Sequence, residues 1–201
     1  MDKIILVGGF NEIIELVEEN SFKIFGIIDE ANTGSIKYEY LGNDNDAKFL
    51  NEDLKSIPIV ITPDLPLVRK RLHKYYKENN FHFISVISKK ARISPSAKIN
   101  LGVVVQAGVN ISANVLIAKF VKLNTNCNIM HNSKIESYTT IAPNAVILGN
   151  VSIGNNCYIG ANSTILPNVS LCDDVIIGAG AVVTKNIYKK GTYVGIPAKK
   201  L

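Results

Sequence analysis

One histidine stands apart in the second half of the chain, where the sequence repeats every six residues. His131 is the only histidine between residues 93 and 201. If three sixes make one coil, the positions stacked beside it hold Ala113, Gly149 and Pro167, which leave room for a ligand. An imidazole can accept a proton near neutral pH, so this placement is typical of a general base. A surface histidine without a role is the alternative.

The repeat itself predicts the elements that position His131. Every sixth residue from Ile93 to Val183 is aliphatic, without a slip or an insertion. The fifth residue of each six is small or β-branched, and the fourth is usually Asn, Gly or Asp. This period predicts a parallel β-helix, in which the aliphatic residues point inward and the fourth residue turns the corner with positive φ. We expect about five coils over residues 93–187.

The first 87 residues have the pattern of a small α/β domain. A strand, a glycine turn, a helix and a second strand form a βαβ unit, and the mixed pattern predicts a mostly parallel sheet. Residues 188–201 are expected to form an extended tail, and His73 and His82 are interpreted as structural. The expected strands are residues 3–7, 22–28, 57–62 and 82–87, and the expected helices are residues 11–19 (capped by Asn11), 47–54 and 63–79.

A glycine loop follows the first predicted strand. Gly8 and Gly9 do not complete the G-x-G-x-x-G pattern of a dinucleotide site. The loop still opens a helix N-terminus, which can hold a phosphate through its backbone N–H groups. Asp29 follows about twenty residues later, where an acid can meet a ribose hydroxyl. A tight turn with a surface acid is the alternative interpretation.

Charge and composition narrow the class of protein. The net charge of +5 divides unevenly, with −7 over residues 1–60, +6 over 61–92 and +6 over 93–201. A basic repeat region attracts phosphates, although it also serves solubility. The positive residues lack aromatic interleaving, which argues against nucleic acid as a partner. No apolar run reaches the ~20 residues of a membrane span, and the N-terminus does not have the pattern of a signal peptide, so a cytoplasmic location is expected.

The three cysteines, Cys127, Cys157 and Cys172, are expected to be reduced thiols without a catalytic role. Two of them occupy inward fifth positions of the repeat, and their spacing does not match a metal site. No metal cofactor is expected.

The whole chain resembles the NeuD/PglD-type sugar acetyltransferases, which are hexapeptide-repeat enzymes. An α/β domain with a glycine loop, an uninterrupted hexapeptide repeat and a Val194–Lys199 tail (Val-Gly-Ile-Pro-Ala-Lys) carry the resemblance. It implies a Rossmann-like domain, residues 1–87, followed by a left-handed parallel β-helix. It also implies a homotrimer, with acetyl-CoA between neighbouring helices and a nucleotide-linked sugar on the N-terminal domain.

The resemblance assigns roles to individual residues. His131 matches the catalytic base and Gly149 the backbone N–H that faces the thioester oxygen. On the acetyl-CoA side the resemblance places Gly149 again, with Thr140, Gly160, Ala161, Gly178, Ala179, Gly180, Pro197, Ala198 and Lys199. On the sugar side it places Gly8, Gly9, Asn11, Asp29, Glu30, Thr62, Arg69 and Asn124.

Three positions depart from the family pattern. Asn132 follows His131 where the family usually has a carboxylate that orients the ring, although an Asn is also what the repeat places at that corner. Thr140 stands where the family has a second histidine. The glycine loop is shortened and has lost its histidine, which leaves the nucleotide carrier open.

The sequence therefore predicts an acetyl-CoA-dependent transferase that acts on an amino or hydroxyl group of a nucleotide-linked sugar of bacterial surface glycans. A β-helix subunit that binds or assembles but has lost activity is the alternative, motivated by Asn132 and the altered loop. A γ-type carbonic anhydrase needs three metal-binding histidines, which His131 alone does not supply.

Overall fold

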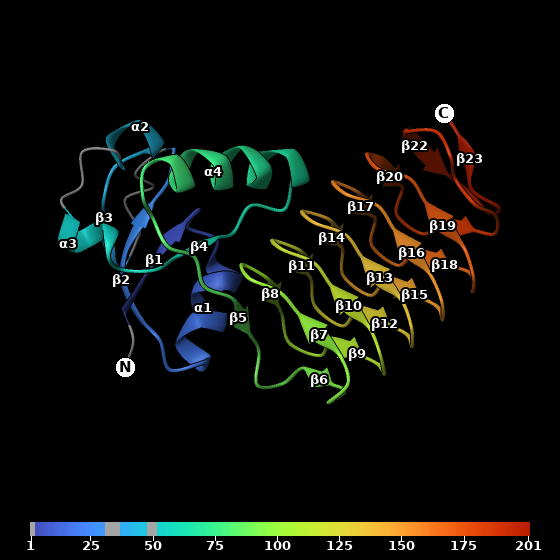
Figure 1. The fold of residues 1–201 in the computed structure, drawn as a ribbon, viewed down its shortest axis with the longest axis horizontal. Helices are drawn as coiled ribbons and strands as arrows, with labels where there is room; N and C mark the ends of the chain where they lie inside the picture. The colour runs from blue at the N-terminus through green and yellow to red at the C-terminus, as the bar shows by residue number, and fades with distance from the viewer. Residues whose placement is uncertain (1–2, 31–36, 48–51) are drawn as a thin grey trace.

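The computed structural model describes residues 3–30, 37–47 and 52–201, which form an α/β domain followed by a β-helix (Figure 1). The α/β domain contains a four-stranded parallel sheet in the order β3-β2-β1-β4. Its elements are β1 (Lys3–Val7), α1 (Asn11–Glu19), β2 (Lys23–Ile28), β3 (Glu39–Tyr40), α2 (Asp44–Ala47), α3 (Glu52–Lys55), β4 (Ile59–Ile61) and α4 (Pro66–Glu78). None of the described helices is long and apolar enough to cross a membrane.

Alternation along β1 places a helix on each face of this sheet. Ile4 and Leu6 belong to a cluster with the buried face of α1, while Ile5 and Val7 belong to a cluster with α4. Figure 1 shows the two helices on opposite sides of the sheet. The chain adds β2 on one side of β1 and β4 on the other, so the carboxyl ends of β1 and β4 form the switch point where open α/β sheets bind ligands.

The structure corrects two details of the predicted domain. The expected strand 82–87 is wrong, because only β5 (Val86–Ile87) is a strand and it pairs with the β-helix, while β3 supplies the fourth strand of the sheet. The helix expected over 47–54 has its described ends in α2 and α3, and residues 48–51 lie outside the described ranges. Asn11 does not cap α1, since Phe10 occupies the N-cap without a side-chain hydrogen bond.

The β-helix consists of short parallel strands in three stacked sheets, which form a left-handed triangular prism. We name the sheets by their size: the eight-stranded sheet contains β5, β8, β11, β14, β17, β20, β22 and β23, the six-stranded sheet β6, β9, β12, β15, β18 and β21, and the five-stranded sheet β7, β10, β13, β16 and β19. The bounds are β6 (Arg92–Ile93), β7 (Lys98–Ile99), β8 (Val104–Val105), β9 (Asn110–Ile111), β10 (Leu116–Ile117), β11 (Lys122–Leu123), β12 (Asn128–Ile129), β13 (Lys134–Ile135), β14 (Thr140–Ile141), β15 (Val146–Ile147), β16 (Ser152–Ile153), β17 (Tyr158–Ile159), β18 (Thr164–Ile165), β19 (Ser170–Leu171), β20 (Val175–Ile177), β21 (Val182–Val183), β22 (Gly191–Val194) and β23 (Lys199–Lys200).

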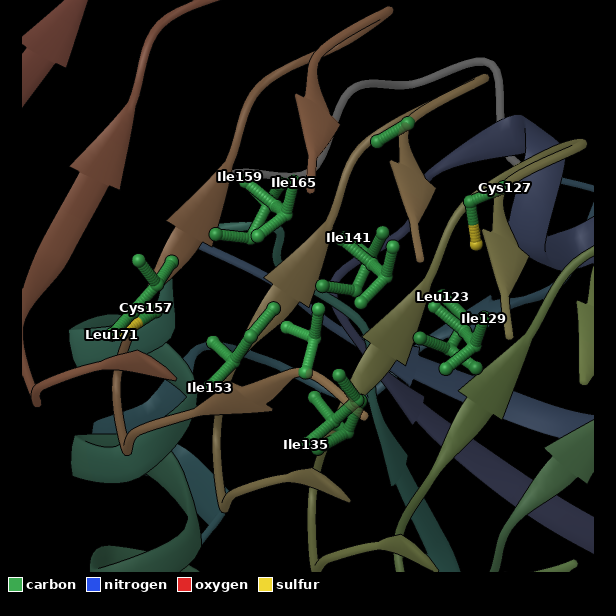
Figure 2. Close-up of a cluster of buried hydrophobic side chains, with 14 of the residues drawn as sticks. Leu123, Cys127, Ile129, Ile135, Ile141, Ile153, Cys157, Ile159, Ile165 and Leu171 are labelled. Atoms are coloured by element: carbon green, nitrogen blue, oxygen red, sulfur yellow. The ribbon is translucent and has the colours of Figure 1, made fainter. Parts of the chain in front are cut away.

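The predicted periodicity is confirmed along the prism. Each aliphatic first residue from Ile93 to Val183 lies in a strand, and consecutive coils pair at a spacing of three sixes, as in Ile117↔Ile135 and Leu123↔Ile141. Figure 2 shows several of these side chains in the interior, among them Leu123, Ile135 and Ile141, together with the thiols of Cys127 and Cys157. The fourth residues of the repeat have positive φ, as expected for corners.

Two corners with positive φ have a residue other than Asn, Gly or Asp at the fourth position of the repeat. Phe120 and Tyr138 have φ values of +56° and +63°, which an aromatic side chain rarely adopts. Their rings stack with a centroid separation of 5.7 Å, and Phe120 belongs to the cluster around α4. These two corners are therefore part of the junction with the α/β domain.

The α/β domain covers one face of the prism. Lys122 and Thr140, on the outer surface of the eight-stranded sheet, donate hydrogen bonds to the carbonyl oxygens of Thr62 and Asp64 in the loop between β4 and α4. In a triangular prism, the edge opposite this face is the one between the six-stranded and five-stranded sheets. The α/β domain of one chain is thus attached to the face opposite that edge.

The tail closes the C-terminal end of the prism. β22 continues the eight-stranded sheet in parallel with β20, and β23 turns back antiparallel to β22. Ile187 also enters the core, so the prism ends at about the predicted position. The tail is therefore a small hairpin within the expected extended segment.

Candidate active site

His131 lies on the edge between the six-stranded and five-stranded sheets, in the turn from β12 to β13. Its side chain is exposed, and its ring covers Gly149 of the next coil. A Cβ atom on Gly149 would come within 2.6 Å of both Nε2 and Cε1 of His131, so only glycine allows the ring to lie there. The predicted pair of His131 and Gly149 is brought together by the stacking of two coils.

Backbone hydrogen bonds between coils fix this edge. The N–H of Asn132 donates to the carbonyl of Ala113 at 2.9 Å, and the N–H of Asn150 donates to the carbonyl of His131 at 2.9 Å. The N–H of Gly149 has no acceptor among the described residues. A donor without a partner, next to an imidazole, suits a negatively charged oxygen that forms during a reaction.

Asn132 contacts the imidazole directly. Its Nδ2 lies 3.2 Å from Nδ1 of His131. Asn132 also has the positive φ of the corner, so it has a backbone role and a side-chain role. A carboxylate in its place would accept a hydrogen bond from Nδ1–H, whereas an amide nitrogen can only donate one.

The residues predicted to contact acetyl-CoA are divided between two edges. Gly149 lies beside His131, and all the others except Thr140 lie on the edge between the eight-stranded and six-stranded sheets. The N–H of Gly178 donates to the carbonyl of Tyr193, and the N–H of Ala198 donates to that of Val182, so the tail follows this second edge. The residues on it are Gly160, Ala161, Gly178, Ala179 and Gly180, together with Pro197 and Lys199 of the tail.

Packing alone accounts for some of these glycines. A Cβ on Gly160 would approach the backbone N of Ala179 to 2.6 Å, and one on Gly178 would approach Cγ1 of Val194 to 2.8 Å. Gly180 has a φ of +68° and open space around it, so its corner conformation is what favours glycine. Ligand contact is an additional role for these positions, not the only reason for their residue type.

Thr140 lies away from both edges. It is fully buried beneath the β4–α4 loop, where its hydroxyl donates to the carbonyl of Asp64 at 2.6 Å. The structure therefore does not bring Thr140 to His131, and its hydroxyl serves the domain junction.

A cleft of about 390 Å³ opens at the carboxyl ends of β1, β2 and β4, at the switch point of the sheet. Gly8, Asp29 and Glu30 line it, as expected, together with residues that the sequence did not single out. A second hollow of about 450 Å³ adjoins it and shares part of the lining. The added residues include Phe10, Asp44, Asp64, Leu65 and Arg71, of which Asp44 and Arg71 also line the second hollow.

The glycine loop is held by Asp29. One carboxylate oxygen accepts the N–H of Gly9 at 2.7 Å, and the other accepts the N–H of Glu30 at 2.7 Å. Gly8 has a φ of +99°, and a Cβ there would collide with Oγ1 of Thr62. Both oxygens of Asp29 thus already hold backbone, while Asn11 is exposed at the start of α1.

Thr62 and Arg69 hold the structure together and do not face the cleft. Thr62 is buried and donates to the carbonyls of Val7 and Gly8 at 2.8 and 2.9 Å. Arg69 is 1% exposed, and burial lowers its pKa to about 10. Its guanidinium donates to four carbonyl oxygens, those of Pro63, Asp64, Phe120 and Tyr138. The predicted substrate contact for Arg69 is corrected to a contact between the two domains.

Asp64 connects the cleft to the prism. Its carboxylate accepts from Nζ of Lys122 at 2.9 Å and from Nδ2 of Asn124 at 3.1 Å. Burial lowers the pKa of Lys122, and the carboxylate of Asp64 opposes that shift. Asn124 is 4% exposed, and its Oδ1 has no partner among the described residues. Asn124 is therefore held beneath the loop that borders the cleft.

Sequence reasoning missed Asp64, Lys122 and Arg71. Lys122 is an outward residue of the repeat, and the burial of its charge follows only from the docked domain. Asp64 was visible as the first acid after a predicted strand, a position that points to the ligand edge of a parallel sheet. Arg71 was one of several basic residues on one predicted helix, and the sequence did not separate it from the others.

Comparison with known proteins supports this architecture. Residues 150–185 match the family model described as bacterial transferase hexapeptide (six repeats). PerB from Caulobacter crescentus, solved in complex with CoA and GDP-perosamine, superposes with a TM-score of 0.93 at 25% identity, over 100% of this chain and 98% of that one. These proteins share one fold.

Two further structures extend the comparison. The acetyltransferase domain of PglB from Neisseria gonorrhoeae FA1090, in complex with acetyl coenzyme A, has a TM-score of 0.89 at 24% identity, over 99% of this chain and 98% of that one. WeeI from Acinetobacter baumannii AYE has a TM-score of 0.73 at 22% identity, and each chain is covered completely. The resemblance to sugar acetyltransferases seen in the sequence is therefore confirmed at the level of the fold. Within the described residues, no group of three His, Cys, Asp or Glu side chains could hold a metal ion.

Proposed function

We propose that this protein transfers the acetyl group of acetyl-CoA to an amino group, or to a hydroxyl group, of a nucleotide-linked sugar used for bacterial surface glycans. The observation that carries the proposal is the His131 ring against Gly149, whose backbone N–H has no acceptor among the described residues. A base and an oxyanion donor on adjacent coils are the two groups that acyl transfer requires. The CoA and GDP-perosamine in the complex of PerB support both the donor and the class of acceptor.

The proposed reaction has two steps, in which His131 moves a proton and Gly149 stabilises negative charge. As the sugar nitrogen attacks the thioester carbon, a C–N bond forms and Nε2 of His131 takes the proton from nitrogen. The N–H of Gly149 stabilises the negative oxygen. The C–S bond then breaks, and the proton passes from His131 to the leaving sulfur, which gives an amide and free CoA thiol. An acceptor hydroxyl would react in the same sequence to give an ester.

The cleft at the end of the sheet is the place we propose for the nucleotide. It lies at the switch point, where α/β sheets bind such ligands, and Arg71 supplies a positive charge for phosphate. PerB was solved with a GDP-sugar, so a GDP-linked 4-amino sugar joins UDP-amino sugars and sialic acid among the acceptors to test.

A homotrimer is part of the same proposal. The α/β domain of one chain is attached to the prism face opposite the His131 edge, so its cleft and its own histidine lie on different sides of the prism. A second chain placed beside the first supplies a histidine edge to that cleft. The residues predicted to contact acetyl-CoA lie on two different edges of one prism, which also supports a site formed between two chains.

The decisive experiment is acetyl-CoA turnover, followed by thiol release, across that panel of acceptors. His131→Ala is expected to lower kcat by about two orders of magnitude or more, the usual effect of removing a positioned base. His82→Ala, which changes an exposed histidine of the other domain, is the matched control and should leave kcat unchanged.

Unchanged kcat in His131→Ala would contradict the mechanism. Calorimetry with acetyl-CoA tests the alternative of a non-catalytic subunit, which the amide nitrogen at Nδ1 favours. Absence of acetyl-CoA binding would favour that alternative over the enzyme.

A further inference from the structure

Four asparagine amides form a row along the edge that carries His131. They occupy the same corner position in successive coils, with φ values of +59°, +59°, +59° and +63°. Each amide donates from Nδ2 to Oδ1 of the next, at 3.2, 3.1 and 3.2 Å. These residues, termed the amide ladder, are Asn114, Asn132, Asn150 and Asn168.

The turn alone does not explain the ladder. Asn144 and Asn162 occupy corners of another edge with φ values of +59° and +57°, yet their amides make no side-chain hydrogen bond to any described residue. Glycine serves the same corner position at Gly102 and Gly108. On the third edge Asn156 donates from Nδ2 to Oδ1 of Asp174 at 3.1 Å, so pairing of corner side chains also occurs there, but among the described residues the row of four linked amides lies on the His131 edge.

The ladder has a direction. An amide presents donors at one end and an acceptor at the other. If a single amide turned round, like groups would face each other on both of its sides, and unmade hydrogen bonds of this kind are costly. The four amides therefore keep one direction together, or they all reverse.

The direction of the ladder determines which atom of the Asn132 amide faces the imidazole. One hydrogen of its Nδ2 is used by Oδ1 of Asn150, and the other is directed to Nδ1 of His131 at 3.2 Å. An amide nitrogen can only donate, so Nδ1 must carry a lone pair. The neutral ring then holds its single proton on Nε2, above Gly149.

We propose that the amide ladder sets the tautomer of His131, with Asn114, Asn150 and Asn168 as positioning residues that act through Asn132. In the direction seen here, the ring is the Nε2–H tautomer, which donates at Nε2 and cannot take the acceptor's proton there, so the proposed base step needs the reversed ladder. Reversal of the ladder places Oδ1 of Asn132 at Nδ1, and the proton moves there through solvent, which leaves Nε2 free to accept. The part of this proposal that concerns turnover rests on the proposed function, whereas the tautomer itself does not.

Two substitutions at opposite ends of the ladder test the proposal. Asp is tolerated at this corner, as Asp174 with its φ of +59° shows. In Asn168→Asp the last residue still accepts from Asn150, so the direction is kept. In Asn114→Asp a carboxylate faces Oδ1 of Asn132, so the ladder must reverse. Asn144→Asp, at the other edge, is the matched control.

The readout is the pair of imidazole ¹⁵N frequencies of the ligand-free protein, at a pH where the ring is neutral. The chain has three histidines, and His131→Gln assigns the signals. We expect Nε2–H in the natural protein, in Asn168→Asp and in Asn144→Asp, and Nδ1–H in Asn114→Asp. The same tautomer in all four proteins, or averaged signals like those of the exposed His82, would overturn the proposal.

Turnover adds a second comparison. We expect kcat of Asn114→Asp to exceed that of Asn168→Asp by about tenfold, the factor that one mispaired amide junction represents. Equal kcat values in the two variants, despite different tautomers, would refute the link to catalysis. If no variant turns over any acceptor while the tautomers follow expectation, the proposed function fails and the ladder stands.

Discussion

The absence of a side chain at Gly149 is what allows His131 to lie flat against the next coil. The ring lies against Gly149 because consecutive coils stack in register, and a methyl group on Gly149 would occupy the position of the ring. The chemistry of the site therefore depends on an atom that is missing as much as on the imidazole.

Gly149→Ala is expected to displace the ring and lower kcat by about a hundredfold, comparable to the loss of an oxyanion donor. Thermal unfolding should occur at nearly the same temperature, because the side chain points outward and its φ is not positive. Pro167→Ala, one coil further along the same edge, is the control. A kcat equal to that of the natural protein would show that the ring need not contact Gly149.

The buried thiols should not react with the reagent of a thiol-release assay. Burial raises the pKa of both Cys127 and Cys157 to about 12, from an ordinary value near 9, so neither forms a thiolate at pH 8. A disulfide reagent should therefore titrate at most Cys172 in the native protein, and all three cysteines in denaturant. Rapid reaction of two or three thiols without denaturant would contradict the inward placement.

At the scale of elements, α4 is joined to the prism by the guanidinium of Arg69 and by His73, whose Nδ1 lies 2.8 Å from the hydroxyl of Tyr138. Arg69 binds carbonyl oxygens on its own loop and on two corners, Phe120 and Tyr138, that have φ values unfavourable for aromatic residues. The helix, the loop and the two corners therefore hold one another in place.

Arg69→Met is expected to lower the free energy of unfolding by about 3–5 kcal/mol, because it leaves several buried carbonyl groups without a donor. Denaturant titration measures the change. Arg71→Met, two residues further on the same helix but exposed, is the control for stability. A loss below about 1 kcal/mol for Arg69→Met would mean that water replaces the guanidinium.

The prism could be predicted from the sequence because its rules are local. An aliphatic residue every six positions and a corner residue with positive φ act within one coil, so Ile93 to Val183 identify their own strands. Phe120 and Tyr138 could not be predicted as corners, since only the docked α4 makes their conformation favourable. The strand expected at 82–87 is only partly formed: Phe83 makes a single bridge to Ile59 of the sheet, whereas Val86 and Ile87 pair with the first coil.

For the site, the sequence predicted some positions and not others. His131 and Gly149 followed from the stacking of sixes into coils. Arg69 and Thr140 looked like ligand-binding residues in the sequence, but both are buried between domains. The cleft added Asp64 and Arg71, which become distinct only after the chain has folded around the switch point.

At the scale of the whole molecule, the two parts of the proposed site, the cleft and His131, lie on opposite sides of the prism within one chain. The cleft belongs to the domain attached to one face of the prism, and His131 lies on the opposite edge. A complete site then requires neighbouring chains, which closed cyclic symmetry supplies.

Sedimentation is expected to give three chains per particle. Co-expression of His131→Ala with the cleft variant Arg71→Ala should recover roughly a quarter of full activity if the chains mix at random. Each variant alone should remain inactive or nearly so. Recovery of no activity from particles that contain both chains would place the cleft and the histidine of one reaction on the same chain.

The coils that follow His131 also fix a length. Coils rise by about 4.8 Å each, the spacing of neighbouring strands. From His131 the same edge passes Gly149 and Pro167 and reaches Lys185 in the last coil, three steps or about 14 Å further on. Because each coil contacts mainly its neighbours, adding or removing one whole coil beyond Gly149 would change this distance by a whole step and leave His131 in place. The number of coils therefore sets the distance along the prism between the histidine and the tail, in steps of one coil.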